Sequence, residues 1–255
     1  MKRKILCFIS VCVFVLAGSF VADSFAEREL IVSAAASLTN AFSEIGKKFE
    51  NANQGTKVIF NFAASGALLQ QIDKGAPVDV FASADRKTMD QAAEKHLIAP
   101  NTRQDFVSNE LVLVLPRGTK APVKTLHDLT GKQIGKVSLG NPASVPAGRY
   151  AQEVLTNEGL WEDLKPKFIF GESVRQVLDY VSRDEVDAGF VFATDAAVAK
   201  DSVEVALEAT KHEPITYPIA VVASTKNMDL AGRFVEFVLS AQGREILSKY
   251  GFKNP

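Results

Sequence analysis

Cysteine is almost absent from the 255-residue chain, which contains only Cys7 and Cys12. Both lie in a leader made of basic residues, an apolar run over 5–16 and a small-x-small motif that ends at Ala26. This pattern predicts a secretory signal peptide, residues 1–26, in preference to an uncleaved membrane anchor, because the apolar run is too short to span a bilayer. Cleavage removes both cysteines, which excludes disulfides, thiol catalysis and thiolate metal sites from the mature chain and leaves no sign of a lipid anchor.

An excess of basic charge is also lacking. Cleavage takes away three basic residues and one acidic residue, so the remaining chain carries 26 basic and 29 acidic side chains, a net charge of −3. No amphipathic basic stretch stands out. We therefore expect no nucleic-acid partner and no membrane-surface binding. The length predicts one large or two modest domains, and the leader predicts a periplasmic location.

Histidine is scarce, which bears on catalysis. The chain has only His96, His127 and His212, each among polar or charged neighbours. It has no G-x-S-x-G, H-E-x-x-H or Walker phosphate loop. We therefore do not expect an enzyme, although a secreted serine-dependent hydrolase stays open as a distant alternative that would need a base beside its serine. An adhesion or structural protein is a third possibility, supported only by secretion.

Apolar runs typical of strands alternate with helical patterns along the rest of the chain. One helical pattern starts at Leu38, and a last helix is expected over about 229–250. This alternation predicts an α/β fold of mixed, mostly parallel sheets with helices on both faces. The expected strands cover residues 29–35, 57–63, 78–84, 110–116, 133–139, 167–171, 187–193 and 215–224.

Two of these strands, 110–116 and 215–224, each follow a polar and irregular stretch. They are the best candidates for strands that cross between two domains. We therefore predict a discontinuous first lobe, residues 27–108 plus 217–255, and a second lobe, residues 109–216. One continuous doubly wound domain is the alternative. Two lobes with a cleft between them would suit ligand capture by hinge closure.

In the first lobe, two segments share one order: an apolar strand, then small residues and a serine, then a helix. They are AAASLTNAF, which contains Ser37, and NFAASGALLQQI, which contains Ser65. Neither contains lysine or arginine. A serine at a helix start offers a hydroxyl, unpaired backbone N–H groups and the positive end of the helix dipole. Each serine alone would be an ordinary helix cap, but the pair predicts an uncharged site for an anion.

Three segments of the second lobe repeat the strand-to-helix transition. In NPASVPAGRYAQEVL, Pro146 suits a first helical turn, after which Ala147 and Gly148 would expose backbone N–H groups. In GESVRQVLDYV, Ser173 can cap a helix and leave the N–H of Val174 unpaired. In DAGFVFATDAAVA, Phe192 ends a strand. Arg149 and Arg175 are the only nearby cations, and we expect both to face solvent.

With these residues identified, the chain resembles the periplasmic molybdate-binding proteins of ATP-driven uptake systems. The resemblance covers essentially the whole mature chain and depends on AAASLTNAF, FAASGALLQQI, the G-N-P to V-P-A-G run and GFVFATDA. It implies the two-lobed class II periplasmic binding protein fold, with no cofactor. The implied ligand is molybdate or tungstate, which a monomer would deliver to membrane permease subunits of an ABC transporter.

The resemblance also implies the contacts to the anion. These are the hydroxyls and backbone N–H groups of Ser37, Ser65, Ala147 and Val174, which reach the oxygens and not the metal. Well-known members of the family have a tyrosine at the position of Phe192, which cannot donate a hydrogen bond, so we place Phe192 in the pocket without assigning it a contact. Sulfate, a smaller tetrahedral dianion, is the alternative ligand. An amino acid or other carboxylate would normally need an arginine in the cleft.

Overall fold

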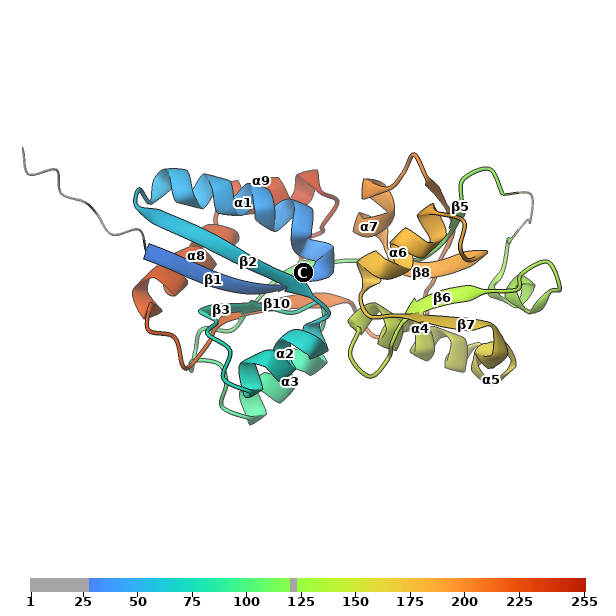
Figure 1. Ribbon diagram of the computed structural model, residues 1–255, viewed down its shortest axis with the longest axis horizontal. Coiled ribbons are helices and arrows are strands. Elements are labelled where there is room, and N and C mark those ends of the chain that lie inside the picture. Colours follow the sequence, from blue (N-terminus) through green and yellow to red (C-terminus); the bar gives the residue numbers. More distant parts are fainter. Residues whose placement is uncertain (1–27, 120–122) are drawn as a thin grey trace, which may run out of the picture.

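The computed structural model describes residues 28–119 and 123–255 and shows two lobes side by side (Figure 1). The predicted signal peptide, residues 1–26, lies outside the described residues. Each lobe is built on one five-stranded sheet. No helix within the described residues combines the length and apolar character needed to cross a membrane.

The first sheet gathers strands from both ends of the chain, in the order β2-β1-β3-β10-β4. β1 pairs in parallel with β2 and with β3, whereas β10 runs antiparallel to β3 and β4. Since the carboxyl ends of parallel strands meet at one edge, the segments after β1, β2 and β3 emerge together. The strands are β1 (Arg28–Ala35), β2 (Thr56–Ala63), β3 (Val80–Ala82), β4 (Gln104–Ser108) and β10 (Thr216–Val221).

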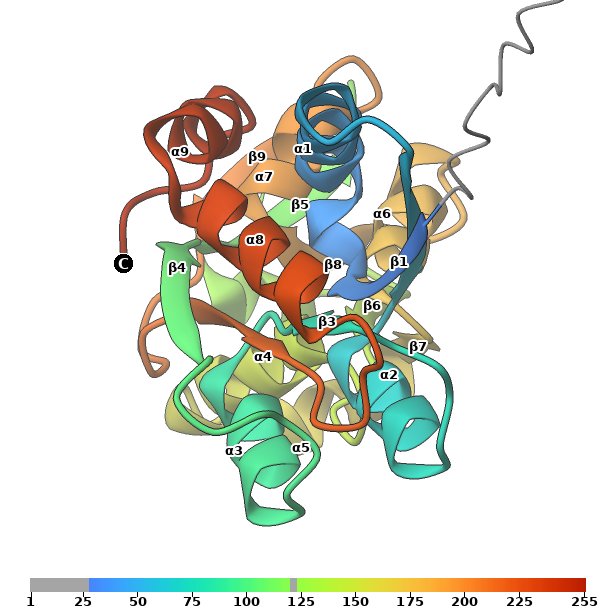
Figure 2. The same ribbon diagram turned by 90° about the vertical axis from the view of Figure 1, so that its left-hand side faces the viewer.

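Helices cover both faces of this sheet, α1, α8 and α9 on one and α2 and α3 on the other (Figure 2). On the first face, Phe49 meets Phe234 edge to face at 5.2 Å between ring centroids. On the second, Leu68 and Met89 are fully buried against Phe81. Burying both faces stabilises the strands that lead to the site. The helices are α1 (Thr39–Ala52), α2 (Ser65–Asp73), α3 (Arg86–Glu94), α8 (Met228–Leu239) and α9 (Ala241–Lys249).

The second sheet repeats this plan with the order β7-β6-β8-β5-β9. β6 pairs in parallel with β7 and β8, and β5 runs antiparallel to β8 and β9. The strands are β5 (Leu111–Pro116), β6 (Val137–Gly140), β7 (Phe168–Gly171), β8 (Ala188–Phe192) and β9 (Val203–Glu208). The helices are α4 (Pro146–Asn157), α5 (Trp161–Leu164), α6 (Val174–Ser182) and α7 (Ala193–Val198), with short 3-10 segments η1 (Ala36–Leu38), η2 (Leu126–Thr130) and η3 (Lys165–Lys167).

The chain passes between the two sheets twice, from β4 to β5 and from β9 to β10. The two crossings are linked, because the N–H of Asn109 donates to the carbonyl of Ile215 at 3.1 Å and that of Ala209 to Leu111 at 2.9 Å. Two adjacent strands of chain between lobes are the usual form of a hinge. The lobe boundaries given above stay a prediction.

The fold class is confirmed, and the structure differs from the sequence prediction in detail. β4 and β9 were not expected, and each adds an antiparallel pairing, so parallel and antiparallel pairings are equal in number among the described strands. The expected last helix is two helices. Ser240 is extended, with φ −66° and ψ 166°, and its hydroxyl accepts from the N–H of Gly243 at 3.2 Å. Ser240 therefore ends α8 and caps α9.

Candidate functional site

Ser37 lies just beyond the end of β1, in the 3-10 turn that leads into α1. Only 3% of its surface is exposed. The small residues before it allow the end of the strand to approach other segments closely. Its Oγ lies 3.0 Å from the hydroxyl of Tyr217 in β10. The hydroxyl is therefore held at the carboxyl edge of the first sheet.

Ser65 is the first residue of α2 and is fully buried. Its Oγ accepts a hydrogen bond from the N–H of Ala84 at 3.0 Å, just after β3. The next residue, Gly66, donates its N–H to the carbonyl of Ser144 in the second lobe at 2.9 Å. A Cβ at position 66 would lie 2.7 Å from that oxygen, so glycine allows the two lobes to touch here.

Two helix starts face this edge from the second lobe. α4 begins at Pro146, followed by Ala147, and α6 begins at Val174 after the capping Ser173, whose hydroxyl accepts from Gln176 at 3.2 Å. N–H groups in a first helical turn have no acceptor within the helix, so those of Ala147 and Val174 can serve a ligand. The expectation for Gly148 was wrong, because its N–H donates to the carbonyl of Val145 at 3.0 Å.

All five residues assigned to the pocket from the sequence line one small cavity between the lobes, of about 10 Å³. No side chain in its lining is ionisable, so the polar groups facing it are hydroxyls and backbone amides. The chemistry of this lining suits an ion that is rich in hydrogen-bond acceptors. The lining residues are Ala35, Ala36, Ser37, Ala63, Ala64, Ser65, Ala84, Val145, Pro146, Ala147, Val174 and Phe192.

The family of bacterial extracellular solute-binding proteins matches residues 30–253. This chain belongs to that family. The molybdate-binding protein ModA of Escherichia coli (strain K12) is 38% identical over 244 residues, which cover 94% of this chain and 93% of that protein. The predicted membership in a solute-binding family is confirmed, and with it an extracytoplasmic place of action.

Two solved structures show the shared fold. The Azotobacter vinelandii periplasmic molybdate-binding protein has a TM-score of 0.78 and 23% identity, and covers 89% of this chain and 99% of its own. The sulfate-binding protein SubI from Mycobacterium tuberculosis H37Rv also has a TM-score of 0.78, with 16% identity, and covers 89% of this chain and 87% of its own. At these identities the match establishes the two-lobed fold alone.

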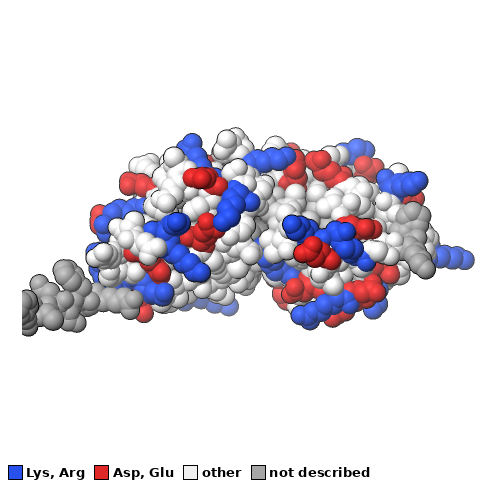
Figure 3. Space-filling model, turned by 90° about the horizontal axis from the view of Figure 1, so that it is seen from above, with Lys and Arg blue, Asp and Glu red and all other residues white. Residues whose placement is uncertain are grey.

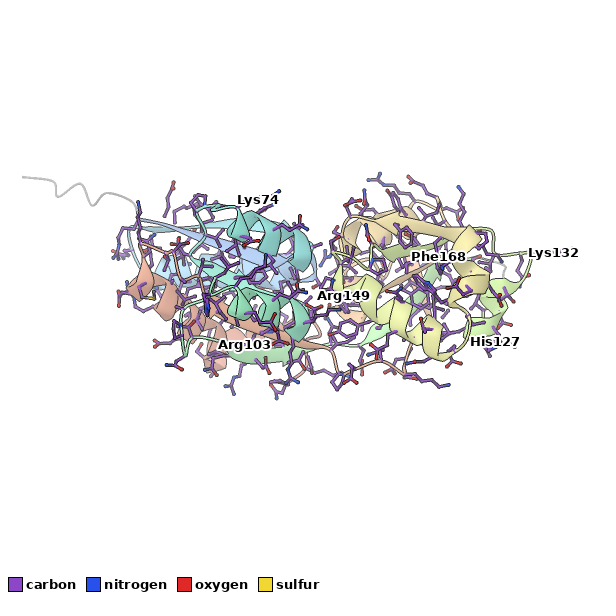
Figure 4. All side chains as sticks on the ribbon, turned by 90° about the horizontal axis from the view of Figure 1, so that it is seen from below. Lys74, Arg103, His127, Lys132, Arg149 and Phe168 are labelled. Atoms are coloured by element: carbon purple, nitrogen blue, oxygen red, sulfur yellow. The ribbon has the colours of Figure 1, made fainter. Side chains whose placement is uncertain are left out.

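Arg149 does not face solvent as expected from the sequence. In this solute-binding protein it lies where the lobes meet (Figure 4) and its guanidinium pairs with Asp85, the capping residue of α3 in the other lobe. Its Nε donates to Asp85 Oδ2 at 2.9 Å and its Nη2 to Thr88 Oγ1 at 2.8 Å. The side chains of Arg149 and Asp85 are only 18% and 4% exposed. The pair joins the lobes beside the cavity.

Arg175 is also paired and not solvated as expected. Its guanidinium donates to Asp195, whose side chain is fully buried in α7. Burial raises the pKa of the Asp195 carboxyl, while the charge of Arg175 opposes that rise. Both arginines near the cavity are therefore neutralised by partners of their own, which leaves the cavity without a free cation among the described residues.

Sequence reasoning missed Tyr217, which lies next to the predicted site. It is fully buried, and its ring meets Phe192 at 5.8 Å between centroids. Its hydroxyl also receives a hydrogen bond from Asn109 Nδ2 at 3.2 Å. Tyr217 lies 180 residues from Ser37, so no local pattern could have revealed the contact.

A second and larger groove, which we call the outer groove, has a volume of about 570 Å³ and is lined by charged residues that include Arg86, Lys87, Arg149 and Glu153. On the face shown in Figure 3, acidic and basic side chains are interspersed over both lobes. No cluster of three or more His, Cys, Asp or Glu side chains able to hold a metal ion is present within residues 28–119 and 123–255.

Proposed function

We propose that this protein is a receptor that captures molybdate, and also tungstate, outside the cytoplasm. One observation carries the proposal: helix starts from opposing lobes bring Ser37, Ser65, Ala147 and Val174 to one cavity without an ionisable lining residue. Similarity to the E. coli molybdate-binding protein over nearly the full length supports the choice of ligand.

The physical basis is hydrogen bonding to a dianion by neutral donors. Each good hydrogen bond to a charged acceptor contributes about 1.5–3 kcal/mol, so several together hold an ion without a formal positive charge. The positive ends of the helix dipoles add to this. When the lobes close, the ion leaves water and the electrostatic interactions strengthen.

The receptor performs no chemistry on its ligand and needs no cofactor, and the anion is contacted through its oxygens. Phe192 supplies apolar lining where a hydroxyl would add a contact. The closed monomer would present the ion to the permease subunits of an ABC transporter in the periplasm. The solute-binding family and the relatives named above support this transport role.

Competition among anions tests the proposal. The secreted, processed protein is mixed with equal amounts of molybdate, tungstate, sulfate and phosphate, and the bound species are weighed by native mass spectrometry. We expect one molybdate or tungstate per chain, with sulfate and phosphate excluded. Occupancy by sulfate alone would make this a sulfate receptor, and no bound anion would contradict the oxyanion function altogether.

A further inference from the structure

Tyr217 is packed into the core of the first lobe. It lies in β10, fully buried, and three aromatic rings surround its own. Their centroids lie 5.5 Å (Phe252), 5.8 Å (Phe192) and 6.4 Å (Phe106) from that of Tyr217, each tilted or edge-on. Rings packed in this way fix the direction of the phenol hydroxyl, which reaches Ser37.

The hydrogen bonds around Asn109 favour Tyr217 as the donor to Ser37. The Oδ1 of Asn109 accepts from the N–H of Glu110 at 2.9 Å, which fixes the orientation of the amide. Its Nδ2 then donates to Thr194 Oγ1 at 2.9 Å and to the Tyr217 hydroxyl at 3.2 Å. Since the Tyr217 oxygen accepts from Asn109, the phenol proton is available to Ser37 Oγ at 3.0 Å.

Burial keeps the phenol protonated. It raises the pKa of Tyr217 well above its usual range, and the nearby charge of Asp195 adds to the rise. Tyr217 therefore keeps a hydroxyl proton that it can donate. When Tyr217 donates to Ser37 Oγ, the proton of the Ser37 hydroxyl is left to point into the cavity that Ser37 lines.

Ser65 is held in the same way by a different group. Its Oγ accepts from the N–H of Ala84 at 3.0 Å, so its hydroxyl proton is likewise free for the cavity. With Tyr217 as the donor to Ser37, each serine oxygen accepts a hydrogen bond from the protein. A ligand that carries its own proton would need an acceptor, and the serines are poorly placed to provide one.

We propose that Tyr217, oriented by Asn109, is a positioning residue that fixes Ser37 as a donor and makes the site discriminate against oxyanions that carry a proton. The inference depends on the proposed oxyanion function and goes beyond it, because it assigns the selectivity to a residue that does not line the cavity. Fully ionised molybdate has no O–H group that needs an acceptor, whereas hydrogen phosphate has one, and the site would leave it unpaired.

Substitution of Tyr217 by phenylalanine tests the inference. Dissociation constants for molybdate and for phosphate are measured calorimetrically near pH 8 in Tyr217→Phe and in wild type. We expect molybdate to bind about tenfold more weakly, as for the loss of one modest hydrogen bond. We expect the preference, measured as the ratio of the phosphate dissociation constant to the molybdate dissociation constant, to fall by more than that factor. Tyr250→Phe is the matched control, because the Tyr250 hydroxyl donates to Glu44 away from the cavity.

If Tyr217 has a purely structural role, Tyr217→Phe weakens the binding of molybdate and of phosphate equally and leaves the preference unchanged. That result would overturn the inference. The double variant Ser37→Ala/Tyr217→Phe adds a second readout. If Tyr217 acts through Ser37, its substitution has no further effect once the Ser37 hydroxyl is gone. If Tyr217→Phe weakened binding as much in the Ser37→Ala background as it does in wild type, the inference would be contradicted. Failure of wild type itself to bind molybdate would instead contradict the proposed function.

Discussion

The ion pair between Arg149 and Asp85 offers a quantitative test of lobe closure. Arg149 comes from α4 and Asp85 caps α3 in the other lobe, so the pair exists only while the lobes touch. Replacing Arg149 by alanine removes the bonds to Asp85 Oδ2 and Thr88 Oγ1 but no group that lines the cavity. We expect the variant to bind molybdate more weakly because the closed form is less favoured.

The size of the effect follows from the burial of the pair. A hydrogen bond to a charged group is worth about 1.5–3 kcal/mol, and the low exposure of both side chains leaves little screening by solvent. At about 1.4 kcal/mol per factor of ten, Arg149→Ala should raise the dissociation constant about tenfold to about a hundredfold. Asp85→Asn keeps the capping acceptor for Thr88 and loses the charge, so we expect a smaller rise, about three- to tenfold.

Calorimetry of the two variants and their double mutant measures this coupling. Arg86→Ala is the matched control, because Arg86 forms an exposed pair with Asp105 inside the first lobe. Equal affinity of Arg149→Ala and wild type would refute a closing role for the pair. Severe loss in Arg149→Ala with no change in Asp85→Asn would show that Arg149 binds the anion directly, against the neutral-donor account.

Three further predictions concern the cavity itself. Phe192→Tyr restores a hydroxyl at the cavity wall and should tighten oxyanion binding by up to about tenfold in calorimetry; an unchanged affinity would show that the missing hydroxyl does not matter. Gly66→Ala places a Cβ 2.7 Å from the carbonyl of Ser144, so we expect weaker binding with little change in melting temperature, and wild-type affinity would argue against close lobe contact. Because no lining side chain is ionisable, molybdate affinity should stay constant between about pH 6 and pH 9, and a step near pH 6.5 would reveal a histidine in the site.

The sequence predicts well what depends on local pattern. Apolar runs locate most strands, and the small residues with serine after two of them locate Ser37 and Ser65, which the structure brings to one cavity. The break at Ser240 was also readable, because serine is a favoured residue at a helix N-cap. β9 has the sequence VEVALE, in which only Val203 is buried, so it lacks the longer apolar run that marks several of the expected strands.

What the sequence does not predict is pairing across long separations. In the sequence, Arg149 looks like a solvated residue near a helix start. Its partner Asp85 lies 64 residues away in the sequence, and only the contact between the lobes reveals the pair. Tyr217 lies in an ordinary buried strand, and its role depends on Ser37 and Asn109, which come from distant segments. Side-chain hydrogen bonds of this kind depend on the tertiary fold and carry no local signature.

A crystal structure of the processed protein with molybdate, with the metal located by its anomalous scattering, tests the central claim most directly. We predict one molybdate between the lobes, with its oxygens within hydrogen-bond distance of the Ser37 and Ser65 hydroxyls and the N–H groups of Ala147 and Val174. An ion bound chiefly by Arg149 or Lys87 in the outer groove would contradict the claim that neutral donors select the ligand.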